Sequence, residues 1–214
     1  MIETSRLILR QWRESDREPY RRLNADPQVM RYFPSRLTSE QSDSQLDVMR
    51  QLINLNGWGF WALEIKQTQE FIGFVGLHQQ AEDSGIPNAP LVEIGWRLDV
   101  HHWGKGYAPE AACAALDYAF RQLNLEQVYS FTALTNVPSQ RVMEKIGMLN
   151  TGQDFDHPKL PTGHELKRHC LYRMTREQWR LTDSIVTSTV GDGLTDLGQS
   201  ATMFANVPCS NAAS

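Results

Sequence analysis

One stretch of the chain, residues 91–119, joins a strand-like segment to a helix-like segment through a short turn that contains glycine. Residues 91–100 alternate apolar with polar or small side chains, and a period of two is typical of a β-strand. Beyond the turn, apolar residues recur every three or four positions and share one face of a predicted helix, namely Ala108, Ala112, Ala115, Ala119 and Leu123. The chain is therefore predicted to be an α/β protein.

The turn itself, Trp103 to Ala108, is a candidate anion site. The first turn of a helix leaves backbone N–H groups without partners, and the helix dipole is positive at that end. A Walker A loop is excluded because its first glycine would fall on Asp99, and the dinucleotide fingerprint is excluded because its third glycine would fall on Pro109. Two glycines also occur in turns that bind nothing, so this pair by itself leaves both interpretations open.

The string VEIGWRLDVHHWGKGYAPEA resembles the acyl-CoA pyrophosphate loop of the GNAT superfamily of acetyl-CoA-dependent N-acetyltransferases. More narrowly, it is similar to the branch that includes the ribosomal-protein N-terminal acetyltransferases. The superfamily pattern Gln/Arg-x-x-Gly-x-Gly/Ala falls on Trp103, Gly106 and Ala108, and Trp103 departs from its first position. The resemblance extends from about Arg6 to about Trp179.

A second motif supports the same resemblance: Asn136-x-x-Ser139, followed by Glu144-Lys145-x-Gly147. The resemblance implies that Asn136 contacts the CoA chain and that Ser139 lies near the thiol and protonates the departing thiolate. The alternative is that both residues only cap a helix, because Asn and Ser commonly hold its first N–H groups. The two roles are compatible.

Glu93 is the candidate general base. Only a neutral amine can attack a thioester, and a nearby carboxylate can take the amine proton. Glu93 projects from the strand that leads into the loop, where several members of the superfamily keep a catalytic glutamate. The period of two alone would instead predict an outward-facing, solvated residue.

The resemblance implies an α/β (α+β) fold with a single GNAT-like domain. Its mostly antiparallel mixed sheet, flanked by helices, would have splayed central strands that admit the pantetheine arm of acetyl-CoA. Backbone groups of Leu98 and Val100 would pair with that arm. The other expected cofactor contacts are Trp103, Gly104, Lys105, Gly106, Tyr107, Ala108, Asn136 and Ser139. Tyr32 and Phe33 precede a helix that would cover the acceptor pocket, or they serve core packing only.

The reaction implied is transfer of an acetyl group to a primary amine by direct attack in a ternary complex. The acceptor expected first is the N-terminal α-amine of a protein or peptide. Two alternatives remain: a small-molecule amine such as a polyamine, an antibiotic or an amino acid, and a non-catalytic acyl-CoA-binding module. Substitution of Glu93 or Ser139 should separate an enzyme from such a module, because turnover would fall while CoA binding remained.

Composition limits the partners and the location. A net charge of −4 favours neither nucleic acid nor an anionic membrane. His101 and His102 lack further ligands at metal spacing, so no metal site is predicted. Three cysteines without CxxC spacing predict reduced thiols. The start MIETSRL is unlike a signal peptide, so we expect a cytoplasmic protein, either monomer or homodimer.

The domain is predicted to span residues 1–182. Beyond Leu181 the composition shifts to Ser, Thr, Gly, Asp and Ala, and residues 183–214 contain no Lys or Arg. We therefore expect residues 183–214 to form an appended tail that is flexible or only partly ordered.

Overall fold

In the computed structural model, which describes residues 1–182, the chain builds a nine-stranded sheet. Its strands follow the order β1-β2-β3-β4-β5-β6-β9-β7, and β8 pairs with β9. The predicted tail, residues 183–214, lies outside the described residues. The bounds of that tail and of the domain before it therefore stay predictions.

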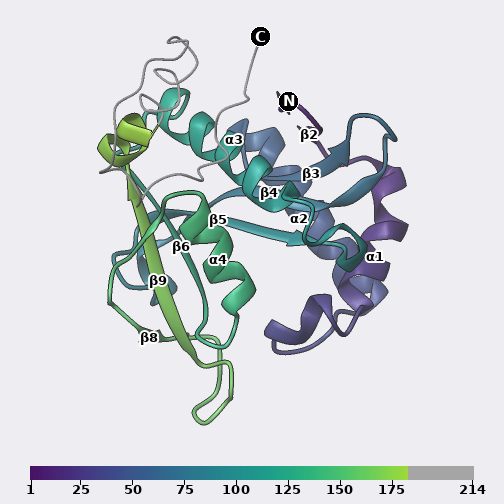
Figure 1. Cartoon of the computed structure of the whole chain (residues 1–214). Coiled ribbons are helices and arrows are strands. Elements are labelled where there is room, and N and C mark those ends of the chain that lie inside the picture. Colours follow the sequence, from purple (N-terminus) through teal and green to yellow (C-terminus); the bar gives the residue numbers. More distant parts are fainter. Residues whose placement is uncertain (183–214) are drawn as a thin grey trace.

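The elements follow the chain in an order that alternates helices with runs of strands (Figure 1). The strands are β1 (Ile2–Glu3), β2 (Leu7–Arg10), β3 (Phe60–Ile65), β4 (Phe71–Gln80), β5 (Leu91–Leu98), β6 (Gln127–Ala133), β7 (Leu149–Asn150), β8 (Phe155–Asp156) and β9 (Arg168–Thr175). The helices are α1 (Arg17–Ala25), α2 (Ser39–Asn56), α3 (Tyr107–Arg121) and α4 (Val137–Lys145), and residues 176–182 are also helical.

The centre of the sheet is where its pairing changes. Neighbouring strands are antiparallel except β5 and β6, which are parallel and share one aligned pair, Glu93 with Tyr129. Beyond that pair the two strands separate, although Ser130 Oγ still donates to the Ile94 carbonyl at 2.9 Å. The predicted fold, a mostly antiparallel mixed sheet with splayed central strands, is confirmed.

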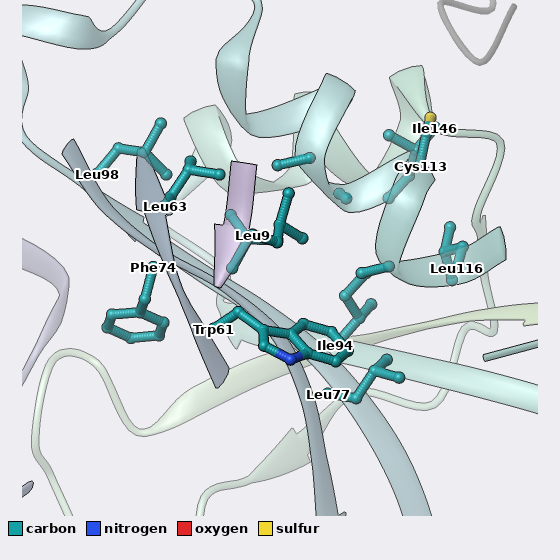
Figure 2. Close-up of a cluster of buried hydrophobic side chains, with 14 of the residues drawn as sticks. Leu9, Trp61, Leu63, Phe74, Leu77, Ile94, Leu98, Cys113, Leu116 and Ile146 are labelled. Carbon is teal, nitrogen blue, oxygen red and sulfur yellow. The ribbon is translucent and has the colours of Figure 1, made fainter. Parts of the chain in front are cut away.

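Different helices cover the two faces of the sheet, and alternation along β5 identifies them. Arg97 Nη1 donates to Asn24 Oδ1 of α1 at 2.6 Å and lies 3.5 Å from Gln45 Oε1 of α2. Successive side chains of a strand point to opposite faces, so Leu98 faces away from these helices. Figure 2 shows Leu98 on the side of the strands where α3 lies, and Phe74 pointing to the other side. Arg97 and Leu98 therefore face opposite layers of helices.

Capping residues set the bounds of the helices. Thr38 Oγ1 accepts from the Gln41 N–H at 3.2 Å, and Gln41 Oε1 accepts from the Thr38 N–H at 2.9 Å, so these two residues form a capping box at the start of α2. Asn136 caps α4, so this helix begins at Val137. The strand predicted to reach Val100 ends at Leu98 because Asp99 caps a short 3₁₀ helix, Val100–His102.

A buried group of charged side chains joins the start of the first helical region to the edge of the sheet. The side chains of Arg10, Asp16 and Glu64 are at most 5% exposed. Arg10 Nη1 and Nη2 donate to the two oxygens of Asp16 at 2.7 and 2.9 Å, and Arg10 Nε donates to Glu64 Oε2 at 2.7 Å. Arg13 Nη1 adds a bond to Glu64 Oε2 at 2.8 Å. Because every charge has a partner, the group can be buried.

The cysteines depart from expectation at one position. Cys170 is a buried free thiol, as predicted. Cys113, within α3, is disulfide-bonded, so the prediction of reduced thiols is wrong there. Within residues 1–182, no helix has both the length and the apolar character needed to cross a membrane.

Candidate active site

A cavity of about 1150 Å³ lies where β5 and β6 separate. It is lined by these two strands, by α2 and α4, by the 3₁₀ helix Val29–Tyr32 and by the turn before α3. Tyr32 and Phe33 line it, as expected. Of the other predicted site residues, the lining includes Glu93, Leu98, Trp103, Gly104, Gly106, Tyr107, Ala108, Asn136 and Ser139. Val100 and Lys105, both within the described part of the chain, do not line it.

Glu93 faces this cavity and is not a solvated surface residue. Its side chain is 15% exposed, and Oε1 accepts from Gln80 Nε2 at 3.0 Å. Burial raises the pKa of Glu93 to about 7, although the bond from Gln80 acts in the opposite direction. A carboxyl group with a pKa near neutrality can both take and release a proton under physiological conditions. The geometry therefore suits the predicted base role, which itself stays a prediction.

His78 of β4 is a titratable neighbour of Glu93. Its Nδ1 lies 3.5 Å from Glu93 Oε1, and its ring stacks on Phe60 with centroids 5.7 Å apart. Burial lowers the pKa of His78, which favours the neutral ring. A neutral neighbour does not favour the ionised carboxylate, which is consistent with the raised pKa of Glu93. Residue spacing alone gave no signal for His78.

Ser139 and Asn136 enter the cavity from the start of α4. Asn136 Oδ1 accepts from the Ser139 N–H at 3.3 Å, and Asn136 Nδ2 donates to Thr132 Oγ1 at 2.8 Å. Both ends of the Asn136 amide are thus engaged by the protein, as the capping alternative predicts. Within residues 1–182 the Ser139 hydroxyl has no hydrogen-bond partner. It is therefore free to bind a ligand in the cavity.

The turn before α3 presents unpaired backbone N–H groups. No acceptor among residues 1–182 takes the N–H groups of residues 104–108, and the first bond of the helix runs from the Glu110 N–H to the Gly106 carbonyl at 3.2 Å. Gly106 precedes α3 at φ +80°, a left-handed conformation that glycine adopts without strain. Several free N–H groups at the positive end of a helix fit a pyrophosphate.

The strand edge beside this turn differs from the prediction in detail. The Leu98 carbonyl already accepts from Trp103 Nε1 at 2.8 Å, and the Val100 carbonyl accepts from the Trp103 N–H at 3.2 Å. Backbone groups two residues apart point to the same edge of a strand, so the backbone N–H and carbonyl of Trp96 point to the same edge as those of Ile94 and Leu98. Trp96 is thus the backbone position in the middle of the open edge, and it also lines the cavity.

Arg6 and Glu110 hold the turn in place through contacts with each other and with Lys105. Neither was predicted from the sequence to contribute to the site. Glu110 Oε2 accepts from Arg6 Nε at 2.6 Å, and Glu110 Oε1 accepts from Thr4 Oγ1 at 2.6 Å. Arg6 Nη1 also donates to the Lys105 carbonyl at 3.0 Å. These contacts join residues about a hundred positions apart, which no local pattern could reveal. They hold the turn against the first strands and leave the exposed Lys105 side chain outside the cavity.

The charge of the lining is strongly one-sided. Among the described lining residues, Glu93 is the single carboxylate. The Arg and Lys residues of the lining are Arg31, Arg97, Arg141, Lys145 and Lys159. Such a lining favours an anionic ligand through its field. The described residues contain no group of three His, Cys, Asp or Glu placed to hold a metal ion, and His101 instead lies 2.8 Å from Asp99.

Comparison with known proteins agrees with this geometry. The family described as "Acetyltransferase (GNAT) domain" matches residues 6–149. An uncharacterized N-acetyltransferase, YnaD of Bacillus subtilis (strain 168), is 30% identical over 178 residues, which are 83% of this chain and 98% of that protein. The crystal structure of a GNAT-family acetyltransferase from Bacillus anthracis has a TM-score of 0.69 and 28% identity, and the match covers 82% of this chain and 98% of that one.

A structure with lower identity shows the same fold. The spermidine N-acetyltransferase of Vibrio cholerae, solved in complex with CoA and spermine, is 23% identical, with a TM-score of 0.65 over 82% of this chain and 99% of that one. The free N–H groups before α3 and the cationic lining suit an anionic ligand. The chain belongs to the GNAT family of acetyltransferases, which use acetyl-CoA as co-substrate.

Proposed function

We propose that this enzyme acetylates a primary amine held in the cavity beside Glu93, and that the acceptor is the N-terminal α-amine of a protein or peptide. The observation that carries the proposal is the buried Glu93 carboxylate, with a pKa of about 7, at the point where β5 and β6 separate. The cavity of about 1150 Å³ exceeds the ~300–1,000 Å³ of ordinary small-ligand pockets, which suits a site that holds a co-substrate arm and an acceptor together.

The proposed chemistry is direct transfer. The amine nitrogen forms a bond to the carbonyl carbon of the acetyl group while the bond from that carbon to sulfur breaks. Glu93 takes the proton that leaves the nitrogen, and the Ser139 hydroxyl gives a proton to the departing sulfur. The proton on Glu93 then passes through solvent to the Ser139 oxygen, which regenerates both side chains. The net result is that one proton has moved from the amine nitrogen to the sulfur. The free N–H groups of residues 104–108 are assigned to the pyrophosphate.

A small-molecule amine is the second candidate. A polyamine is the least favoured acceptor of this kind, because it carries several positive charges and the described lining offers one carboxylate against five Arg and Lys side chains. A small amine without extra positive charge fits as well as a peptide N-terminus does.

The test begins with a calorimetric titration with acetyl-CoA, using NAD as the control ligand. Binding in the micromolar range, about −8 kcal/mol, is expected. Mass spectrometry should then follow acetylation of two acceptor sets: peptides with free N-termini and small amines that include a polyamine. Peptides blocked at the N-terminus are the matched control. If only small amines gain an acetyl group, the N-terminal acceptor is rejected and the second candidate holds.

Replacement of Ser139 by Ala should lower kcat by about 10-fold and leave the Kd for acetyl-CoA unchanged. General acids commonly contribute about 10²–10⁴-fold, and the effect is smaller here because a thiol, with a pKa of about 8.5, already leaves readily. Steady-state kinetics and calorimetry measure the two quantities. The Thr135→Ala variant, changed in the same loop but outside the cavity, is the control. An unchanged kcat would remove Ser139 from the mechanism.

Replacement of Gly106 by Val should weaken acetyl-CoA binding by about 10-fold. A β-branched residue does not accept φ near +80°, so the turn must rearrange and its N–H groups lose their common direction. Its Cβ would also lie 3.4 Å from Arg6 Nη2. Gly163→Val imposes similar strain, at φ +83°, in a loop outside the cavity. Equal effects of the two variants on the Kd would show that the Gly106 turn has no special role.

A further inference from the structure

The side chain of Arg97 is a buried cation in the lining of the cavity. Arg97 is 8% exposed and lines the cavity from β5. It is held by neutral groups: Nη1 donates to Asn24 Oδ1 at 2.6 Å and lies 3.5 Å from Gln45 Oε1. Within residues 1–182 no Asp or Glu forms an ion pair with it. A guanidinium cannot lose its proton in a protein, so Arg97 is an uncompensated buried charge.

The unused edge of this guanidinium is the one that binds anions. Both recorded hydrogen bonds use Nη1. Nε is buried without a partner, and no described residue accepts from Nη2. In arginine the N–H groups of Nε and Nη2 are parallel, and this fork matches the two oxygens of a carboxylate or phosphate. Asn24 thus occupies one end of the group and leaves the fork free.

The protein fixes the plane of Arg97. Its Cζ lies 4.0 Å from the ring centroid of Phe33 and 5.4 Å from that of Phe74. Phe33 directly follows the 3₁₀ helix Val29–Tyr32 in the cavity lining, and Phe74 belongs to β4, directly across from Arg97. Contacts with two rings orient a guanidinium without neutralising it. Burial lowers the pKa of Arg97, which is the direction expected where no carboxylate compensates the charge.

A continuous aromatic surface connects Arg97 with Glu93. The ring of Phe74, next to Arg97, lies 5.2 Å from that of Phe60, and Phe60 stacks on His78 beside Glu93. On β5 itself, residues 93 and 97 point to the same face and their Cα atoms are about 13 Å apart. The carboxylate and the cation therefore lie at two ends of an apolar surface.

We infer that the Nε–Nη2 edge of Arg97 binds an anionic group of the acceptor, a carboxylate or a phosphate, while the acceptor amine lies at Glu93. This inference rests on the proposed acetylation of an amine and narrows its substrate class. The acceptor has an apolar middle that lies on Phe60 and Phe74. In a peptide, which extends by about 3.3–3.6 Å per residue, an acidic side chain at the second or third position has the required reach. In a small molecule, the anion lies several bonds from the amine.

The experiment compares acceptors that differ only in charge. One arm uses peptides with free N-termini and amidated C-termini, with Glu or Gln at the second or third position. The other arm uses straight-chain ω-amino acids of increasing length and their primary amides. The wild-type kcat/KM should be about 10- to 100-fold higher for the anionic member of a pair, because the neutral acceptor cannot form the two charge-assisted hydrogen bonds with Arg97. The arm that shows the preference identifies the source of the anion.

Variants separate binding from structural support. In Arg97→Gln the ratio of kcat/KM for anionic over neutral acceptors should fall to near 1, and in Arg97→Lys it should fall partly because the fork is gone. The control is Arg31→Gln: Arg31 also lines the cavity, but it is exposed and lies over Tyr32. That variant should keep the ratio within about three-fold, since exposed charges are screened.

Two results would overturn the inference. The first is a wild-type ratio near 1 in both arms, which needs no variant. The second is an Arg97→Gln variant whose kcat/KM falls equally for both members of each pair, because a purely structural arginine would give that pattern. Failure of the proposed function looks different: the protein would bind acetyl-CoA and acetylate no amine of either arm.

Discussion

Replacing Glu93 by Gln is expected to lower kcat by about 10²- to 10⁴-fold, the range that general bases commonly contribute. The amide keeps the shape of the side chain and can still bond to Gln80, but it cannot take a proton from the amine. The Kd for acetyl-CoA should be unchanged, since the N–H groups assigned to the pyrophosphate lie at residues 104–108. Steady-state kinetics and calorimetry separate the two quantities.

The pH profile gives the same prediction a second measurement. The raised pKa of Glu93, about 7, means that the carboxyl group is protonated and inactive below this value and ionised and active above it. The wild-type kcat/KM should therefore rise through an apparent pKa near 7. In Glu93→Gln that limb should disappear, and only the ionisation of the acceptor amine should remain. A wild-type limb that persists in the variant would show that another group is the base.

Stability provides the control against misfolding. A carboxyl group whose pKa is raised in the folded state binds more protons folded than unfolded, so stability falls as pH rises from about 4.5 to about 7. Glu93→Gln should remove that loss and be more stable than the wild type at pH 8, with similar stability near pH 4. The exposed residue Glu82 offers a matched variant, Glu82→Gln, that should change neither activity nor stability.

Replacing Asp16 by Ala is expected to destabilise the protein by about 3–5 kcal/mol, as removal of one partner from a buried ion pair commonly does. Arg10 would lose the acceptor of two bonds, at 2.7 and 2.9 Å, and keep only Glu64. The Arg13 N–H would also lose its 2.7 Å bond to Asp16 Oδ2. Urea unfolding followed by circular dichroism measures the free energy of unfolding.

Asp47 is the matched control for Asp16. It too accepts from two arginines, Arg17 and Arg50, but its side chain is 38% exposed. Asp47→Ala should therefore cost less than about 1 kcal/mol. If the two variants lose equal stability, burial does not distinguish the Arg10 group from an ordinary surface network.

The sequence was informative where neighbours along the chain decide the outcome. The glycine turn between β5 and α3 is a local feature, and the spacing of its residues was sufficient to predict it. The alternation in β5 also placed Glu93 and Arg97 on one face. It could not show that α1 and α2 cover that face, because this depends on tertiary packing. The raised pKa of Glu93 follows from its burial in the folded chain and so could not be predicted.

The features that the sequence did not predict all depend on distant residues. The hydrogen bond between Arg6 and Glu110 joins residues 104 positions apart in the sequence, and the bond between Arg97 and Asn24 joins residues 73 positions apart. The backbone contacts of Leu98 and Val100 with the co-substrate stay predictions, and the sequence did not show that Trp103 donates to both carbonyls. The period-two pattern of β5 does not show that the side chain of Trp103 folds back onto this strand.

The single aligned pair between β5 and β6 should also influence how fast the protein is degraded. The sheet has an incomplete seam at its centre, and in the proposed mode of binding the co-substrate completes it. A ligand that binds only the folded state adds about 2.7 kcal/mol to its stability at 100 times its Kd. Local opening at the seam, and with it proteolysis, should therefore slow as acetyl-CoA rises. The abundance of the enzyme would then follow the metabolic supply of its own substrate.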